Sequence, residues 1–187
     1  MAENMESHRV IPLRAAGLGN FSRTRSRFVE AAWILIEWAV VTNPLQISTR
    51  IRKSALRLFG AKIGDRVILR PRMRVKFPWN LSVGDDTWIG EDVWIHNQGP
   101  VKIGHDCVVS QGTFISTGSH EIRENMDLIV EPIEIQSGAW ITARCIITKG
   151  VVIGQNTVVT PGSVVYKSLP ENSIYSGNPA KFVRNRF

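Results

Sequence analysis

The chain has 187 residues, of which 43% are apolar and 21% charged, a balance typical of one globular domain rather than a disordered chain. No run of about eighteen apolar residues is present to form an ordinary membrane-spanning helix. The first residues lack the apolar core of a secretory signal, and two cysteines are too few for a disulfide framework. We therefore expect a cytoplasmic location.

The net charge of +7 is unevenly distributed along the chain. Residues 1–76 hold fifteen basic and five acidic residues, whereas residues 77–187 hold eight basic and eleven acidic residues. A nucleic-acid-binding domain would carry the basic excess itself, but here the excess lies wholly in the N-terminal part. The asymmetry favours a basic flank beside an anionic partner, such as the inner face of a membrane, and argues against nucleic acid.

Residues 1–60 are predicted to form a basic arm followed by a helical cap. We expect residues 1–27 to be arm-like or disordered. Residues 28–41 are apolar except for two glutamates, and Asn43-Pro44 ends this predicted helix. A second predicted helix over residues 51–59 is rich in basic side chains. The two helices either plug the open end of the next domain or lie on a membrane surface, and the two roles are compatible.

Residues 61–187 are dominated by an aliphatic residue at every sixth position. A period of six is neither the two of a strand nor the 3.6 of a helix, but it fits a coil of three short strands and three corners. We therefore predict an all-β solenoid whose stacked coils bury these residues. The positions are Ile63, Leu69, Val75, Val83, Ile89, Ile95, Ile103, Val109, Ile115, Ile135, Ile141, Ile147, Ile153, Val159 and Val165.

A second inward position follows four residues after each aliphatic one and must hold a small or slender side chain near a corner. Only Leu169 departs from this rule after the first coil. In the first coil, Val67, Met73 and Trp79 occupy the position, which predicts a frayed or capping coil. Cys107 and Cys145 are therefore expected to be buried structural thiols. The remaining positions are Thr87, Val93, Gly99, Thr113, Ser119, Ala139, Val151, Thr157 and Ser163.

One long insertion interrupts the solenoid. Ile103 and Ile135 are thirty-two residues apart, fourteen more than an eighteen-residue coil requires. The extra residues fall between His120 and Ile133, so we expect a loop over residues 121–133. A loop of this length in a regular solenoid is usually functional.

The motifs VGDDTW, IGEDVW, IGHDCV and IGQNTV resemble those of the hexapeptide-repeat acyltransferases. The segments LFGAKIG, STGSHEI, GAWITARCIITKGVVIG and SGNPAKFVR are similar to the exopolysaccharide (colanic-acid), maltose, galactoside and nodulation-type acetyltransferases. The resemblance implies a left-handed parallel β-helix, a homotrimer with active sites between subunits, and acetyl-CoA as co-substrate without a metal. It further implies O-acetylation of a saccharide in polysaccharide or surface glycan biosynthesis.

A sugar hydroxyl is a poor nucleophile and needs a base as it attacks a thioester, a role that suits histidine. His120 stands where the insertion begins and matches the family's catalytic position, so it is the expected general base. The sequence does not choose which carboxylate orients it. The candidates are Glu121, Glu124, Asp127 and Glu131.

The remaining site residues come from the resemblance. Asn97 matches an acceptor-contacting residue, with a plain turn asparagine as the alternative. Trp140 is expected either to line the substrate site or to pack between subunits. The cofactor-binding positions are the turn residues Ala143 and Pro161, which would hold pantetheine, and the cations Lys167, Lys181 and Arg184, which suit the phosphates of CoA.

Three alternatives stay open at this stage. The acceptor could be an antibiotic or other small molecule, or the chain could be a non-catalytic β-helix trimer. A carbonic-anhydrase-like β-helix would need three histidine zinc ligands, and no H-x₄-H pair exists here. Among the other histidines, His96 is a weak secondary candidate, His105 lies in an ordinary turn and His8 lies in the arm.

Overall fold

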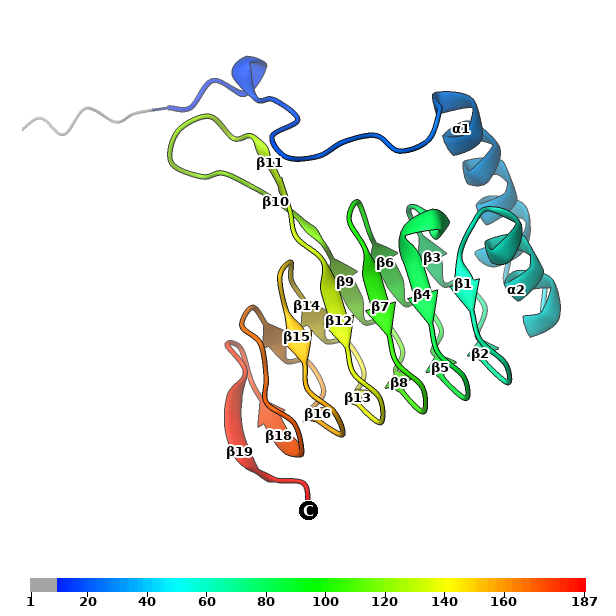
Figure 1. The fold of residues 1–187 in the computed structure, drawn as a ribbon, viewed down its shortest axis with the longest axis vertical. Coiled ribbons are helices and arrows are strands. Elements are labelled where there is room, and N and C mark those ends of the chain that lie inside the picture. The colour runs from blue at the N-terminus through cyan, green and yellow to red at the C-terminus, as the bar shows by residue number, and fades with distance from the viewer. Residues whose placement is uncertain (1–9) are drawn as a thin grey trace, which may run out of the picture.

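The computed structural model describes residues 10–187 and consists of a stack of coils with two helices at one end (Figure 1). His8 lies outside the described residues. Helix α1 (Arg27–Ile36) continues into a π-helical turn, η2 (Glu37–Val41), and α2 (Thr49–Leu58) follows. The hydroxyls of Ser26 and Ser48 cap the two α-helices by accepting N–H groups of their first turns. The two predicted helices are therefore confirmed. Within residues 10–187, neither has the length and composition to cross a bilayer.

The coils form three parallel sheets, one for each side of the solenoid. The first has five strands, β1 (Lys62–Ile63), β4 (Leu81–Val83), β7 (Val101–Ile103), β12 (Ile133–Ile135) and β15 (Val152–Ile153). The second begins with β2 (Ile68–Leu69), β5 (Trp88–Ile89), β8 (Val108–Val109), β13 (Trp140–Ile141) and β16 (Val158–Val159), and β18 (Ser173–Ser176) and the antiparallel β19 (Lys181–Asn185) complete it. The third contains β3 (Arg74–Val75), β6 (Trp94–His96), β9 (Phe114–Ser116), β14 (Ile146–Ile147) and β17 (Val164–Val165).

The interior follows the predicted ladder. All fifteen aliphatic positions are buried, and they stack on one another across the parallel strand pairs. Of the second inward positions, Ser119 is the exception: it is exposed, and Thr117 is buried in its place, accepting a hydrogen bond from the N–H of Gly99 at 2.9 Å. The expectation for Ser119 is wrong because the chain leaves the stack at Gly118.

The first coil caps the stack and is not frayed. Its three strands pair in regular register with those of the second coil. Val67 and Met73 are buried, and Trp79 is half-buried. Arg52 of α2 is also buried, and its guanidinium donates to the carbonyls of Val41 and Leu69. The helices therefore close this end of the core, as the plug interpretation predicted.

The corners explain the glycine and aspartate of the repeat. A side chain at Gly84 would lie 2.6 Å from the backbone nitrogen of His105 in the next coil, so stacked corners require glycine. Two residues later, Asp86 has φ +55°, and Asp106 and Asn156 take the same left-handed conformation, which Asp and Asn tolerate better than most residues.

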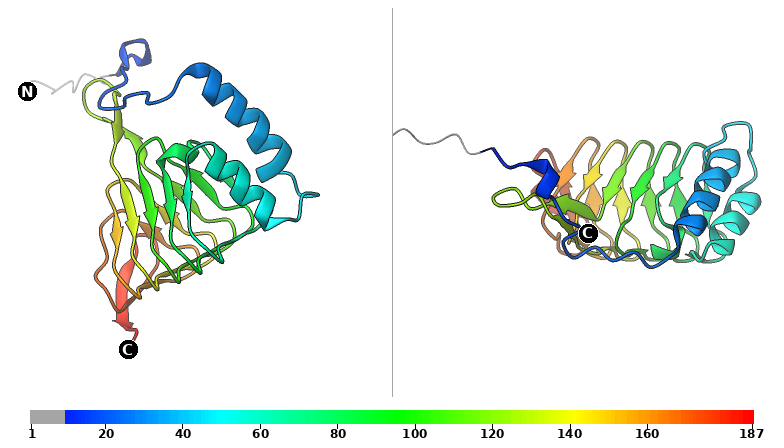
Figure 2. Two further views of the ribbon diagram at one scale, coloured as in Figure 1. Left: turned by 45° about the vertical axis from the view of Figure 1, so that its right-hand side comes forward. Right: turned by 90° about the horizontal axis from the view of Figure 1, so that it is seen from above.

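The insertion is an antiparallel hairpin, β10 (Gly118–His120) and β11 (Leu128–Val130), that projects from the stack (Figure 1). Residues 10–26, which include the 3₁₀ turn η1 (Leu13–Ala15), run along one side of the stack from α1 to this hairpin (Figure 2). Gly17 donates its N–H to Asp127 at 2.6 Å, and the side chain of Asn20 bonds both the N–H and the carbonyl of Val130. The described part of the predicted arm is thus held in place. A second 3₁₀ turn, η3 (Pro78–Asn80), precedes β4.

Candidate active site

A cavity of about 470 Å³ lies where the arm, α1, the third sheet and the hairpin meet. Four segments that are far apart in sequence supply its walls. The arm provides Leu18, Phe21 and Arg23; α1 and η2 provide Glu30, Ile34 and Glu37; the coils provide Arg74, Lys76, Phe77, Trp94, His96 and Gln98; and the hairpin provides Leu128.

Two carboxylates enter this cavity from the helices. Glu30 pairs with Arg23 through one oxygen, while its other oxygen is buried without a hydrogen-bond partner among the described residues. Glu37 accepts the N–H of Val75 at 2.6 Å. Burial raises the pKa of Glu37, although that N–H and the charge of Arg74 act in the opposite direction. The second oxygen of Glu30 is thus a buried acceptor without a partner in the described chain, an arrangement that costs free energy.

The coil side of the cavity carries cations and aromatic rings. The guanidinium of Arg74 lies 4.3 Å from the centre of the Trp94 ring, and the ammonium of Lys76 lies 3.1 Å from Nε2 of His96. Burial is the main cause that lowers the pKa of Lys76 and of His96, and the neighbouring cations lower the His96 pKa further. A neutral His96 accepts a hydrogen bond from Lys76, so this wall combines apolar ring faces with hydrogen-bond donors.

His120 is exposed on the hairpin, beside the cavity. It pairs with Leu128, and residues directly opposite one another in an antiparallel pair have side chains on the same face. His120 therefore shares the hairpin face of Leu128, which lines the cavity. Its Nδ1 lies 2.8 Å from the carbonyl oxygen of Met126. Because a carbonyl only accepts, Nδ1 carries the proton and Nε2 of the neutral ring is left as an acceptor.

None of the four candidate carboxylates orients His120. Glu121 accepts the backbone N–H groups of the turn that follows it, which lowers its pKa. Asp127 binds Gly17 and Asn125, and Glu131 pairs with Lys149 at 2.6 Å. Glu124 accepts no hydrogen bond among those described. The orienting group is instead a backbone carbonyl, which has no side-chain signal in the sequence.

Known proteins are similar to this chain along most of its length. A family model described as the hexapeptide repeat of succinyl-transferase matches residues 80–117 and 132–167, on either side of the hairpin. A putative colanic acid biosynthesis acetyltransferase of Escherichia coli K12 is 38% identical over 155 residues, covering 82% of this chain and 85% of that protein. The chain belongs to the hexapeptide-repeat acetyltransferases.

More distant members of the family share the fold. The galactoside O-acetyltransferase of Escherichia coli K12 is 28% identical over 137 residues, covering 71% of this chain and 68% of that protein. The structure of a hexapeptide-repeat acetyltransferase from Vibrio cholerae complexed with acetyl coenzyme A has a TM-score of 0.81 at 21% identity, covering 91% of this chain and 96% of that chain. A galactoside acetyltransferase in complex with coenzyme A has a TM-score of 0.78 at 20% identity, covering 88% and 86%. The expected left-handed β-helix is thereby confirmed.

In this acetyltransferase Asn97 has a structural role. Its side chain is fully buried, donates to the carbonyl of Phe77 at 2.7 Å and accepts the N–H of Phe77 at 3.0 Å. This structure matches the alternative role, a turn asparagine whose amide holds two coils together, and contact with an acceptor stays a prediction. The neighbouring His96, the weak secondary candidate, lines the cavity.

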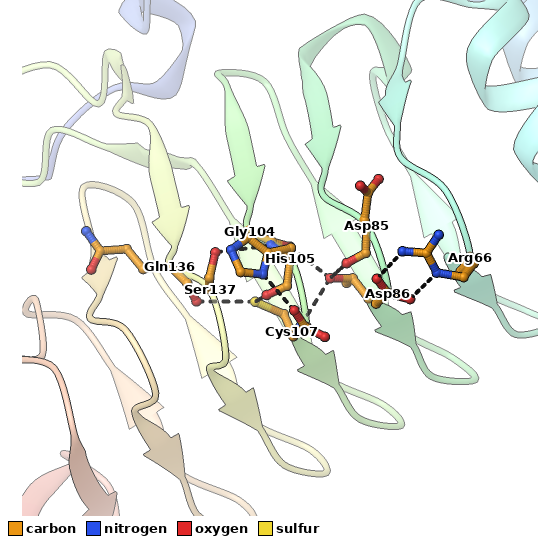
Figure 3. A network of polar contacts seen from close by, with 10 residues as sticks. Arg66, Asp85, Asp86, Gly104, His105, Cys107, Gln136 and Ser137 are labelled. Atoms are coloured by element: carbon orange, nitrogen blue, oxygen red, sulfur yellow. Dashed lines mark hydrogen bonds and ion pairs between the residues drawn. The ribbon is translucent and has the colours of Figure 1, made fainter.

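Figure 3 shows the corner network that contains His105 and Cys107. His105 is exposed, and its Nδ1 lies 2.7 Å from the carboxylate of Asp106. Along the same row of corners Arg66 pairs with Asp86. The thiol of Cys107 is buried 3.2 Å from the carbonyl of Gln136, and burial raises its pKa. The network is a structural feature of stacked turns.

Cys145 occupies an equivalent inward position. It is buried, its thiol lies 3.2 Å from the carbonyl of Thr160, and burial raises its pKa. A protonated, inward-facing thiol is a poor nucleophile. Both cysteines are thus the structural thiols that the sequence predicts.

The predicted donor residues lie in the later coils and the C-terminal strand. The turns of Ala143 and Pro161 stack, since the N–H of Gly162 donates to the Ala143 carbonyl at 3.0 Å. Trp140 is half-exposed on the second sheet and donates to the hydroxyl of Ser110. The three cations Lys167, Lys181 and Arg184 are exposed. None of these six residues lines the cavity beside His120 within the described chain.

Proposed function

We propose that this acetyltransferase moves an acetyl group from acetyl-CoA to a hydroxyl group of a saccharide, with His120 as general base. The observation that carries the proposal is the Nδ1–Met126 contact, which leaves Nε2 as an acceptor beside a polar cavity. The names of the relatives support the substrate class, since they include colanic acid biosynthesis and galactoside O-acetyltransferases. Acetyl coenzyme A and coenzyme A are bound in two structures of similar fold.

The chemistry is a direct transfer within a ternary complex. Nε2 of His120 takes the hydroxyl proton as the oxygen forms a bond to the thioester carbonyl carbon. The tetrahedral intermediate then collapses, the carbon–sulfur bond breaks, and the imidazolium returns the proton to the leaving thiolate of CoA. No acyl-enzyme is needed, and the two buried cysteines are poorly placed to form one.

The cavity suits a saccharide acceptor. The rings of Phe77 and Trp94 provide apolar surfaces on which the C–H face of a sugar can pack. Arg74 and Gln98, which line the cavity, provide hydrogen-bonding groups for its hydroxyls. A sugar has an apolar C–H face and polar hydroxyl groups, so a charged residue next to an aromatic ring suits it.

The donor site is assigned to the stacked turns and the C-terminal cations. A pantetheine arm can bond the backbone of the Ala143 and Pro161 turns, although Pro161 has no N–H to donate. Lys167, Lys181 and Arg184 can neutralise the phosphates of CoA, and each is exposed. Trp140, half-exposed on β13 three residues before Ala143, contacts either substrate in this proposal.

A homotrimer completes this site in the proposal. Two columns of apolar residues face outward from the second and third sheets, and Trp88 and Trp140 are about half-exposed in the isolated chain. A threefold assembly would cover them and bring the donor residues of one copy to the hairpin of its neighbour. The columns are Trp88, Val108, Trp140 and Val158, and Trp94, Phe114, Ile146 and Val164.

The test is thiol release from acetyl-CoA across a panel of saccharides, antibiotics and small amines. His120→Ala should lower turnover by about 10²–10⁴-fold while the oligomer and CoA binding are kept. His105→Ala is the matched control, because that imidazole is equally solvent-facing but lies in the corner network. Full activity of His120→Ala would remove the general-base role. Turnover with amines alone would favour the small-molecule alternative, and no turnover at all would favour a non-catalytic trimer.

A further inference from the structure

Helix α1 and the π-helical turn η2 carry apolar residues on both sides: Trp33 and Val41 are buried in the core, and the outer side is apolar as well. Two acidic side chains, Glu30 of α1 and Glu37 of η2, line the cavity. Glu37 also accepts the N–H of Val75 in β3. Its outward surface carries Phe28, Leu35 and Trp38, of which Phe28 is 88% and Trp38 76% exposed. A helix on the surface of a soluble domain usually carries polar residues on its outer side, so this outer side is unusually apolar. Nothing in the described chain covers the apolar stripe.

The stripe continues onto the loop after η2 and onto α2. Trp38 and Leu45 border one shallow hollow, so the two elements share a surface. Ile51 and Leu58 lie seven residues apart, two turns along the same side of α2, and both are exposed. We call this surface the end-cap patch. Its members are Phe28, Leu35, Trp38, Leu45, Ile47, Ile51 and Leu58.

The exposed charges of residues 25–60, the segment that forms the end-cap patch, are basic. Between residues 25 and 60 the only acidic side chains are Glu30 and Glu37, which point inward. The basic side chains of the same segment that make no ion pair within the described chain are Arg25, Arg27, Arg50 and Lys53. Tryptophan and phenylalanine on a helix flanked by cations match the composition of helices that lie in a membrane interface.

We propose that the end-cap patch docks on the surface of a lipid bilayer that contains anionic headgroups. Phe28, Trp38 and Leu45 enter the interface, and the surrounding cations bind the lipid phosphates. Charge complementarity favours this partner over a second copy, because two end-cap patches placed face to face would bring basic rims together. If the chain forms the proposed trimer, threefold symmetry places all three patches at the same height along the axis, where they can meet one flat surface.

The docking places the candidate active site at the membrane. The inner side of α1 lines the cavity while its outer side forms the patch, so one helix separates the bilayer from the acceptor site. This last step rests on the proposed function and indicates a saccharide carried on a lipid anchor. The docking itself does not depend on the enzyme activity.

Co-sedimentation of the full chain with vesicles tests the proposal, using phosphatidylcholine with and without phosphatidylglycerol. The wild type should bind the anionic vesicles and lose binding at high salt. The double variant Phe28→Ser, Trp38→Ser should bind roughly tenfold or more weakly, because two interfacial rings are removed. The double variant Arg50→Gln, Lys53→Gln should lose about fivefold for each charge. Phe187→Ser is the matched control, since Phe187 is 83% exposed outside the patch.

Equal sedimentation of the wild type and both double variants would overturn the proposal. So would a lower molecular mass of Phe28→Ser, Trp38→Ser in light scattering, since the patch would then be a contact between copies. Acetyl transfer to a soluble saccharide is measured on the same samples and should be unchanged. Failure of that assay in the wild type would count against the proposed function alone.

Discussion

The coil stack and the hairpin with its arm are held in place by different interactions. The stack buries one aliphatic residue at each sixth position, and its strands pair with the coils above and below. The hairpin has one antiparallel pairing of three residues and is tied to the arm by a few polar contacts such as Gly17–Asp127. Stability therefore resides in the repeat, whereas the proposed general base, His120, stands where the repeat is interrupted.

Replacing an isoleucine by alanine in each region should give the largest difference in the free energy of unfolding. Ile89→Ala removes a side chain that is 1% exposed in the stack and should lower the free energy of unfolding by about 2–5 kcal/mol. Ile122→Ala changes an isoleucine that is 75% exposed in the hairpin loop and should cost about 0.5 kcal/mol or less. Urea denaturation of both variants measures the difference. Equal losses would contradict the division of roles.

The contact between arm and hairpin should affect activity more than stability. Asp127→Ala removes the acceptor for the N–H of Gly17 and the side chain of Asn125, next to the carbonyl that orients His120. We expect turnover to fall by about tenfold, since a small misplacement of a catalytic group is costly. Glu124→Ala, in the same loop, is the control. A Tm shift without a loss of turnover would show that the contact is only structural.

His96 belongs to β6 of the stack and lines the cavity, and its protonation should make the stability of the protein depend on pH. Its pKa is lowered below 6.5, chiefly by burial and then by Lys76 and Arg74, so the folded state binds this proton less readily than the unfolded state. The stability that neutral His96 contributes is therefore present above pH 6.5 and is lost as the pH falls through the lowered pKa. The unfolding free energy of the wild type should fall relative to His96→Gln over this range. Parallel pH curves would contradict the shift.

The smallest effect on activity is expected for the cysteines. Cys107→Ala and Cys145→Ala shorten inward side chains of the stack and should cost about 1 kcal/mol of stability. Neither should change the rate of acetyl transfer, because the proposed reaction forms no thioester on the protein. A large loss of turnover in a variant that keeps its Tm would point to a covalent route instead.

The repeat could be predicted position by position, while the site could be predicted only in part. His120 and the insertion were recognisable because both break the period, and the hairpin that carries His120 contributes Leu128 to the wall of the cavity. Ser119 was misplaced because counting in sixes continues past the point at which the chain leaves the stack. The contacts of Asn97 could not be predicted, since the burial of its amide against Phe77 depends on the packing of two coils.

The sequence by itself determined the solenoid and its interior, because a period of six leaves one arrangement in which all the aliphatic residues are buried. Only the tertiary structure decided what lies around His120. The cavity joins an aperiodic arm, a helix, two coils and the hairpin, and the group that sets the tautomer is the backbone carbonyl of Met126. Contacts between segments about 110 residues apart, such as Gly17 with Asp127, leave no periodic pattern, because they depend on how the chain folds back on itself.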